Sequence, residues 1–209
     1  MKIMRFILLV VLCVTACSQN RDDLTVKQTF EGYRSAILNN NGDAAYNLID
    51  KNTRRWYSES LQRALTFNRA EIMKLGVMDK MQVIMIRHRV PSDELLEMNG
   101  EDLFKYAVDH GWVSKNSVLK LQIGKIDVQG DFATGVVRSN DQDTPLRFHF
   151  YRNEGNWGID LTVMTRMGEA AFLKEIKESG ETEIDYIFKL TQIVSGKPVQ
   201  ESVWEPLKN

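Results

Sequence analysis

The chain contains very little cysteine. It has two cysteines among 209 residues, Cys13 and Cys17, and both lie near the N-terminus. The long remainder therefore offers no disulfide, no thiol nucleophile and no thiolate ligand for a structural metal site. We expect the body of the protein to be stabilised by packing alone.

Several other features are absent. The 27 Lys and Arg side chains are balanced by 28 Asp and Glu side chains, so no basic surplus exists to attract nucleic acid phosphates. There is no histidine pair at helical spacing, no glycine-rich phosphate loop and no Gly-x-Ser-x-Gly elbow. We therefore expect no metal, no cofactor and no nucleic acid partner.

The N-terminus has the parts of a secretory signal peptide. Met1–Arg5 is short and basic, Phe6–Val14 is apolar, and small residues follow. An apolar run of this length is too short to span a bilayer as a helix, which needs roughly 20 residues. The pattern predicts a signal peptide over residues 1–16.

The tetrad Val14-Thr15-Ala16-Cys17 resembles the lipobox of bacterial lipoproteins. The resemblance implies that Cys17 gains a diacylglyceryl thioether, becomes the new N-terminus and is then acylated, for example with palmitate. The partner at this end would be the membrane, with residues 17–25 as a lipidated tether. Ser18 is not the aspartate that retains many such proteins in the inner membrane, which favours the outer membrane facing the periplasm. The alternative is an ordinary signal peptide with a chance cysteine.

The first half of the body is patterned as helices. Apolar side chains recur at intervals of three and four residues, at Val26, Phe30, Tyr33, Ile37 and Leu38, and residues 39–42 predict the end of this helix. Further helical segments are expected after a cap at Asp43, from Ser58 or Ser60 to near Gly76, over the apolar run 78–86, and after a cap at Asn99.

After Trp112, the spacing of apolar residues changes from a helical period of about 3.6 toward the period of two that is typical of strands. We expect four strands in an antiparallel meander, with a bulge at Gly124 and a polar loop over 139–144. The expected strands are 119–128, 132–138, 146–151 and 157–163. Helices are predicted again over 168–179 and 181–194, followed by a surface tail over 196–209. Helices followed by an antiparallel sheet indicate an α+β fold.

The segments 30–37 and 41–49 look like the start of a nuclear transport factor 2-like domain, and 150–161 resembles its last hairpin. The resemblance implies N-terminal helices packed on a curved antiparallel sheet, which forms a cone over residues 26–165. Extra helices would form an insertion near 58–116 and a C-terminal extension over 166–209. The superfamily includes enzymes, transport factors and lipoproteins, so the fold alone does not give the function.

The candidate catalytic residues are His149 and Asp160. They lie on neighbouring predicted strands, where they could form a general base and its orienting carboxylate. In the alternative, Phe148 and Phe150 face the core. His149 and Asp160 then lie on the wetter face of the sheet, as solvated or ion-paired groups. Registers cannot be fixed from the sequence.

Other polar and apolar features have simpler interpretations. His88 and His110 fit helix ends, and Arg54-Arg55-Trp56-Tyr57 either contacts a partner or packs its rings in the core. A methionine series predicts a core face or, alternatively, the wall of a loosely specific pocket. Its members are Met73, Met78, Met81 and Met85.

We expect a membrane-anchored envelope lipoprotein with a non-catalytic role, which holds an apolar or peptide-like ligand or docks an envelope protein. Whether it is an enzyme is left open. One alternative is a small pocket enzyme of the isomerase or cyclase kind that uses the Asp160–His149 pair. Another is a purely structural envelope component.

Overall fold

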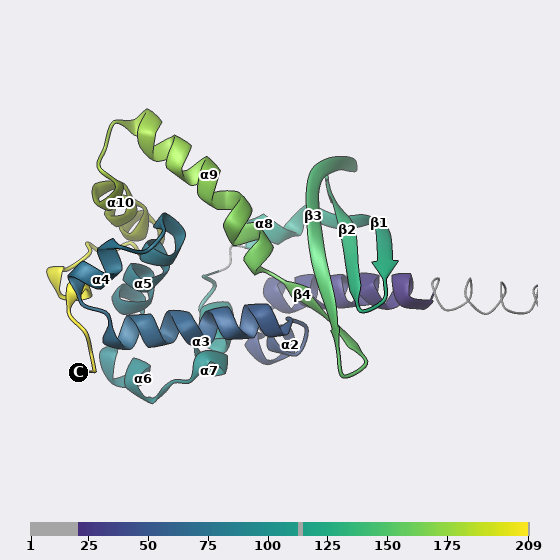
Figure 1. The fold of residues 1–209 in the computed structure, drawn as a ribbon, viewed down its shortest axis with the longest axis horizontal. Coiled ribbons are helices and arrows are strands. Elements are labelled where there is room, and N and C mark those ends of the chain that lie inside the picture. Colours follow the sequence, from purple (N-terminus) through teal and green to yellow (C-terminus); the bar gives the residue numbers. More distant parts are fainter. Residues whose placement is uncertain (1–20, 113–114, 209) are drawn as a thin grey trace, which may run out of the picture. The chain divides into compact units, whose positions relative to one another are not determined.

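A computed structural model of the chain describes residues 21–112 and 115–208 (Figure 1). The predicted signal peptide and Cys17 lie outside the described residues. The chain divides into two compact units, which are described separately. Unit 1 consists of Met1–Lys51 and Ala107–Asp160, and unit 2 of Asn52–Tyr106 and Leu161–Asn209.

Unit 1 opens with a helix over residues 21–38. Of the five apolar positions predicted from its periodicity, Val26, Phe30, Tyr33 and Ile37 are buried, and Leu38 is only partly buried. Residues 21–25 are helical too, so the expected tether does not extend to residue 25. The first turn is polar and shows no apolar period, but Asp22 forms a 2.6 Å ion pair with Arg152.

The next helix, α2 (Gly42–Tyr46), is capped by Asn41, whose side chain accepts a hydrogen bond from Ala44 N at 2.9 Å. The expected cap at Asp43 is therefore wrong by two positions.

The chain then runs beside strand β4 (Asn156–Asp160). Ile159 N donates to Leu48 O at 2.9 Å, and Asp50 N donates to Ile159 O at 3.0 Å. The approach requires glycine at position 158, because a Cβ there would lie 2.8 Å from Asp50 N.

The sheet is a four-stranded antiparallel meander of order β1-β2-β3-β4, as predicted. Besides β4, its strands are β1 (Leu121–Gln129), β2 (Phe132–Ser139) and β3 (Gln142–Asn153), and the short helix α8 (Lys115–Leu119) precedes them. The register of β1 with β2 shifts between Ile123 and Ile126, which confirms the bulge predicted at Gly124.

Two strand boundaries differ from the prediction. Asn140 and Asp141 both have positive φ, of 50° and 60°, so a two-residue turn replaces the expected longer loop. Strand β4 ends at Asp160 rather than 163, because Leu161 is already in the right-handed helical region and α9 begins at Thr162.

One face of the sheet is packed against the helix of residues 21–38. Phe148, Phe150 and Ile159 are buried, and the Phe30 ring lies 5.1 Å from the ring of Phe148. Burial of each such side chain contributes roughly 1.5–3 kcal/mol to folding. This contact accounts for much of the core of unit 1.

Unit 2 is built from helices, and α7 extends three residues beyond it. They are α3 (Lys51–Thr66), α4 (Arg69–Met73), α5 (Val77–Arg89), α6 (Ser92–Glu97), α7 (Gly100–Asp109), α9 (Thr162–Ser179), α10 (Glu183–Ser195) and the 3-10 helix η1 (Glu201–Trp204). Helix α3 starts well before the predicted Ser58, and the stretch to Gly76 is interrupted at Asn68, which caps α4 with a capping box. The cap predicted at Asn99 is confirmed, since its side chain accepts from the N–H groups of Glu101 and Asp102.

Helix α5 occupies the centre of unit 2 and contacts α4, α9, α10 and η1 (Figure 1). Its buried apolar side chains include Val83, Ile84 and Ile86, so the prediction of a methionine core face is wrong. Met73 lies on α4 with 45% of its surface exposed, and Met78, Met81 and Met85 are only partly buried.

The C-terminal segment does not simply run over the surface, as the sequence suggested. Val203 and Trp204 are each only 3% exposed. Phe188 of α10 stacks on Trp204 with ring centroids 5.6 Å apart. Val203 and Trp204 therefore attach the C-terminal segment to the rest of unit 2.

Candidate functional site

The structure places His149 and Asp160 directly opposite each other as partners in the β3–β4 ladder. His149 is half-buried and meets the Phe132 ring edge-on at 5.3 Å. Asp160 is only 2% exposed, so the expectation that it lies on a wetter face is wrong. Neither residue lines either of the two pockets described below.

The side chain of His88, in the last turn of α5, is not freely solvated. Its Nε2 lies 2.8 Å from Ser195 Oγ, which joins α5 to the end of α10. Burial lowers the pKa of His88 below its usual value, and the charges of Arg89 and Lys197 lower it further. His110 is exposed at the end of α7.

Two absences concern the described residues. Among residues 21–112 and 115–208, no group of three or more His, Cys, Asp or Glu side chains could hold a metal ion. Within the same ranges, no helix combines the length and apolar character needed to cross a membrane.

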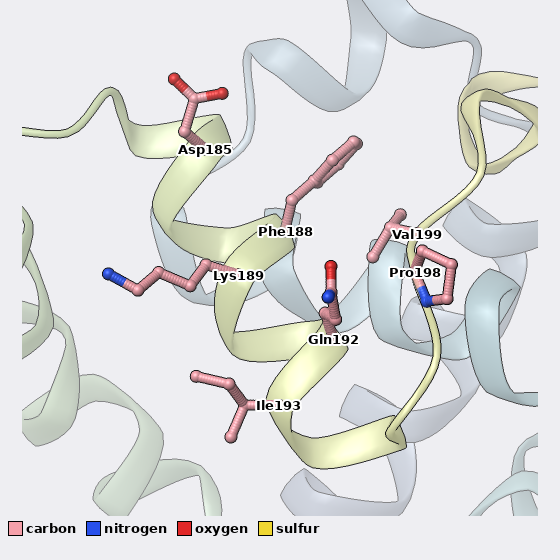
Figure 2. A pocket seen from close by; sticks show the side chains of 7 residues that line it. All are labelled: Asp185, Phe188, Lys189, Gln192, Ile193, Pro198 and Val199. Atoms are coloured by element: carbon pink, nitrogen blue, oxygen red, sulfur yellow. The ribbon is translucent and has the colours of Figure 1, made fainter.

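The first pocket of unit 2 is a groove between α10 and the segment that follows it, here named the α10 groove (Figure 2). Its volume is about 350 Å³, and it is lined by Asp185, Phe188, Lys189, Gln192, Ile193, Pro198 and Val199. Figure 2 shows Phe188 and Gln192 on the side of α10 that faces Pro198 and Val199. The side chains of Lys189 and Ile193 project elsewhere, and Ile193 is 67% exposed.

The second pocket lies between α3, the start of α5 and the start of α9, and is here named the α3–α9 pocket. Its volume is about 290 Å³. It is lined by Trp56, Glu59, Arg63, Gly76, Met78, Asp79, Thr162, Thr165, Arg166 and Glu169. Its walls carry three carboxylates, two guanidinium groups, an indole and a thioether.

One hydrogen bond and one ion pair, both to Asp79, fix one side of the α3–α9 pocket. Trp56 Nε1 donates to Asp79 Oδ1 at 3.3 Å, and Arg63 Nη1 lies 2.9 Å from Asp79 Oδ2. The carboxylate of Asp79 thereby holds the indole ring and neutralises one guanidinium.

The other two carboxylates of this pocket are less engaged. With the residues that the structure describes, Glu59 makes only long ionic contacts, 3.9 Å to Arg55 and 3.8 Å to Arg63. Glu169 is half-buried and makes no hydrogen bond or ion pair with any described residue.

For Tyr57, the structure confirms the interpretation that the Arg54–Tyr57 segment packs its rings in the core. Tyr57 is buried between the rings of Trp56 and Phe104, at 5.1 Å and 4.9 Å. Burial raises the pKa of Tyr57 to about 12. Trp56, in contrast, presents part of its surface to the α3–α9 pocket, a role that its sequence position alone did not reveal.

Sequence reasoning missed the α10 groove, whereas Met78, which lines the α3–α9 pocket, belongs to the methionine series for which a pocket wall was the alternative prediction. The exposed pair Ile193 and Val194 beside Pro198 was the one local signal for the α10 groove. The other residues of the α3–α9 pocket come from distant parts of the chain and have no local signature. Comparison with protein families, with curated proteins and with solved structures finds no match to this chain.

Proposed function

We propose that the protein is a lipid-anchored lipoprotein of the bacterial envelope whose body binds another molecule without catalysis. The anchor is the lipid on Cys17, and Ser18 favours the outer membrane facing the periplasm. Two acyl chains are enough for stable anchoring, since each buried methylene contributes about 0.8 kcal/mol.

We also propose that unit 1 has a nuclear transport factor 2-like fold. Two observations support this: the helix of residues 21–38 packs on a four-stranded antiparallel meander through Phe30 and Phe148, and Leu48–Asp50 runs beside the last strand. The domain would cover residues 26–165, and unit 2 would contain the insertion and the C-terminal extension.

The observation that carries the binding role is the α10 groove. Phe188, Pro198 and Val199 give it apolar walls, while Gln192 and Asp185 supply polar groups among its lining residues. Its volume of about 350 Å³ lies at the lower end of the range for ligand pockets, which runs from about 300 to 1,000 Å³. A groove of this size and lining suits one or two apolar side chains of a peptide segment better than a large ligand.

The groove is tested by placing a photo-crosslinking amino acid at Gln192 in the membrane-bound protein. We expect a discrete adduct with an envelope protein or peptide that is lost when Phe188→Asp is added. A crosslinker at Leu119, which is 50% exposed but belongs to unit 1, is the control. The same adducts from both positions, or an adduct that survives Phe188→Asp, would contradict docking in this groove.

Native mass spectrometry of the gently extracted protein then separates a bound ligand from a bound protein. A mass equal to the lipidated chain alone, together with no groove-specific adduct, would favour a purely structural component.

The anchor is tested separately. We expect labelled palmitate to enter the wild-type chain and not the Cys17→Ala variant, which should leave the membrane fraction. Label that persists in Cys17→Ala would contradict lipidation at this residue.

One observation favours the enzyme alternative. His149 and Asp160 are register partners, the arrangement needed for a base and its orienting carboxylate. The test is NMR of the imidazole of His149 during screening of small cyclic and carbonyl compounds. An enzyme site requires a saturable shift that Asp160→Asn weakens, and the binding role proposed above requires none.

A further inference from the structure

We propose that the α3–α9 pocket binds an alkylammonium group, that is, a protonated primary amine on a short aliphatic chain. The site depends neither on the lipid anchor nor on the α10 groove, because the two pockets share no residue.

The ionic side chains of this pocket carry a net negative charge, because its three carboxylates outnumber its two guanidinium groups. Arg63 is paired with Asp79, and Arg166 Nη1 donates to Thr162 Oγ1 at 2.8 Å. The Glu169 carboxylate has no such partner among the described residues, although it is half-buried. A carboxylate in that position gains more from a cation than an exposed one does, because screening by water is weaker.

The uncharged walls suit an aliphatic chain. Trp56 offers an indole face whose orientation is fixed by the hydrogen bond to Asp79, and Met78 offers a flexible thioether. An ammonium near an indole also gains a cation–π contribution. The volume of about 290 Å³ lies near the lower limit for ligand pockets, about 300 Å³, which suits a small aliphatic amine.

An anion fits this pocket less well. The first residues of α5 line it, and Gly76 provides no side-chain cap for this helix. However, the Glu169 carboxylate already lies there, since a Cβ built at Gly76 would come within 2.8 Å of Glu169 Oε1. An entering anion would meet this carboxylate, whereas an ammonium would bind it.

The experiment is isothermal titration calorimetry of the full chain in a mild non-ionic detergent. The probes are butylammonium, putrescine and Nα-acetyl-lysine methylamide, with n-butanol as the uncharged probe. We expect saturable binding of the amines and none of the alcohol. Preference for putrescine would indicate a free diamine, and preference for the lysine derivative would indicate a peptide side chain.

Two variants assign the binding to this pocket. Glu169→Gln removes the charge at nearly constant shape, and we expect it to weaken amine binding about 10- to 100-fold, the usual effect of losing one charge-assisted hydrogen bond. Glu178→Gln lies on the same helix, with its side chain 65% exposed and outside the pocket, and should leave the affinity unchanged.

A third variant, Gly76→Ala, keeps every charge but makes the Glu169 carboxylate move, and should weaken binding several-fold. Amine affinities are compared only for variants whose melting temperature equals that of the wild type. Amine binding that is absent from the wild type, equal to that of n-butanol, or unchanged in Glu169→Gln would overturn the proposal.

Discussion

Arg87 donates a hydrogen bond from Nη1 to the carbonyl oxygen of Val203 at 2.9 Å, across 116 positions of sequence. The same guanidinium donates to Ala64 O and to Phe67 O, each at 2.6 Å. The last carbonyls of a helix have no partner within it, so Arg87 satisfies the end of α3 and attaches η1 to it. Burial lowers the pKa of Arg87 to about 10, which still leaves it charged at neutral pH.

We expect Arg87→Met to reduce the free energy of unfolding by about 1–3 kcal/mol, because buried carbonyl oxygens lose a charged donor. Denaturant titration measures the loss, and limited proteolysis should show earlier cleavage near residues 196–209. The control is Arg55→Met, whose side chain is 68% exposed and whose ion pair is 3.9 Å long. That change should stay within about 0.5 kcal/mol. Equal losses of unfolding free energy in both variants would contradict a stabilising role for the Arg87 hydrogen bonds.

The lowered pKa of His88, caused by burial and by the charges of Arg89 and Lys197, predicts a loss of stability in acid. The folded protein binds the His88 proton at a lower pH than the unfolded chain does, so unfolding takes up a proton. The protonation of His88 has no effect on the free energy of unfolding above pH 6.5, its ordinary pKa. As the pH falls through about 6.5, protonation of the unfolded chain progressively destabilises the fold. Thermal unfolding at pH 7.5, 6.5 and 5.5 measures this effect. His88→Gln should show a shallower pH dependence than the wild type, and identical slopes would be inconsistent with the prediction.

Two glycines should respond oppositely to the same substitution. A Cβ at Gly158 would lie 2.8–2.9 Å from backbone atoms of Ile49 and Asp50, so Gly158→Ala should cost about 1–3 kcal/mol or more. Gly168 lies inside α9 with nothing within 4 Å of an added Cβ. Gly168→Ala should therefore stabilise the protein by about 0.5–1 kcal/mol. Urea titrations of the two variants check both signs.

Tyr57 predicts a loss of stability at high pH. The unfolded chain releases the phenol proton near pH 10, and the folded chain near 12. Stability from this group is therefore complete below pH 10 and falls by about 2–3 kcal/mol as pH rises through 12. Tyr57→Phe keeps the ring contacts and should be less sensitive to this pH range in denaturant titrations. A wild type and variant that lose stability in parallel would show that Tyr57 is not responsible.

Local patterns predicted the elements that depend on local signals. The apolar spacing of Val26 to Ile37, the cap at Asn99 and the bulge at Gly124 are all encoded within a few neighbouring residues. The start of α3 was missed because its buried face includes the polar side chains Thr53 and Ser60, which hide the helical period.

Features that depend on distant contacts could not be predicted in this way. Alternation along β4 indicated a solvated Asp160, but Leu48–Asp50 pairs beside that strand, and the carboxylate is buried. Likewise, Trp56 and Glu169 line the same pocket from opposite parts of the sequence. His149 and Asp160 were predicted as candidates from the sequence. Their register in the β3–β4 ladder was not predicted, because it depends on the packing of the sheet.

The bridge between Ile49 and Ile159 has a consequence for self-association. An unpaired strand at the border of a sheet is a template onto which another polypeptide can add, and this is a common route to aggregation. By pairing with Ile159, the short stretch after α2 occupies that border with the protein's own backbone. A deletion between α2 and α3 would uncover it and should make the protein prone to fibrillar assembly.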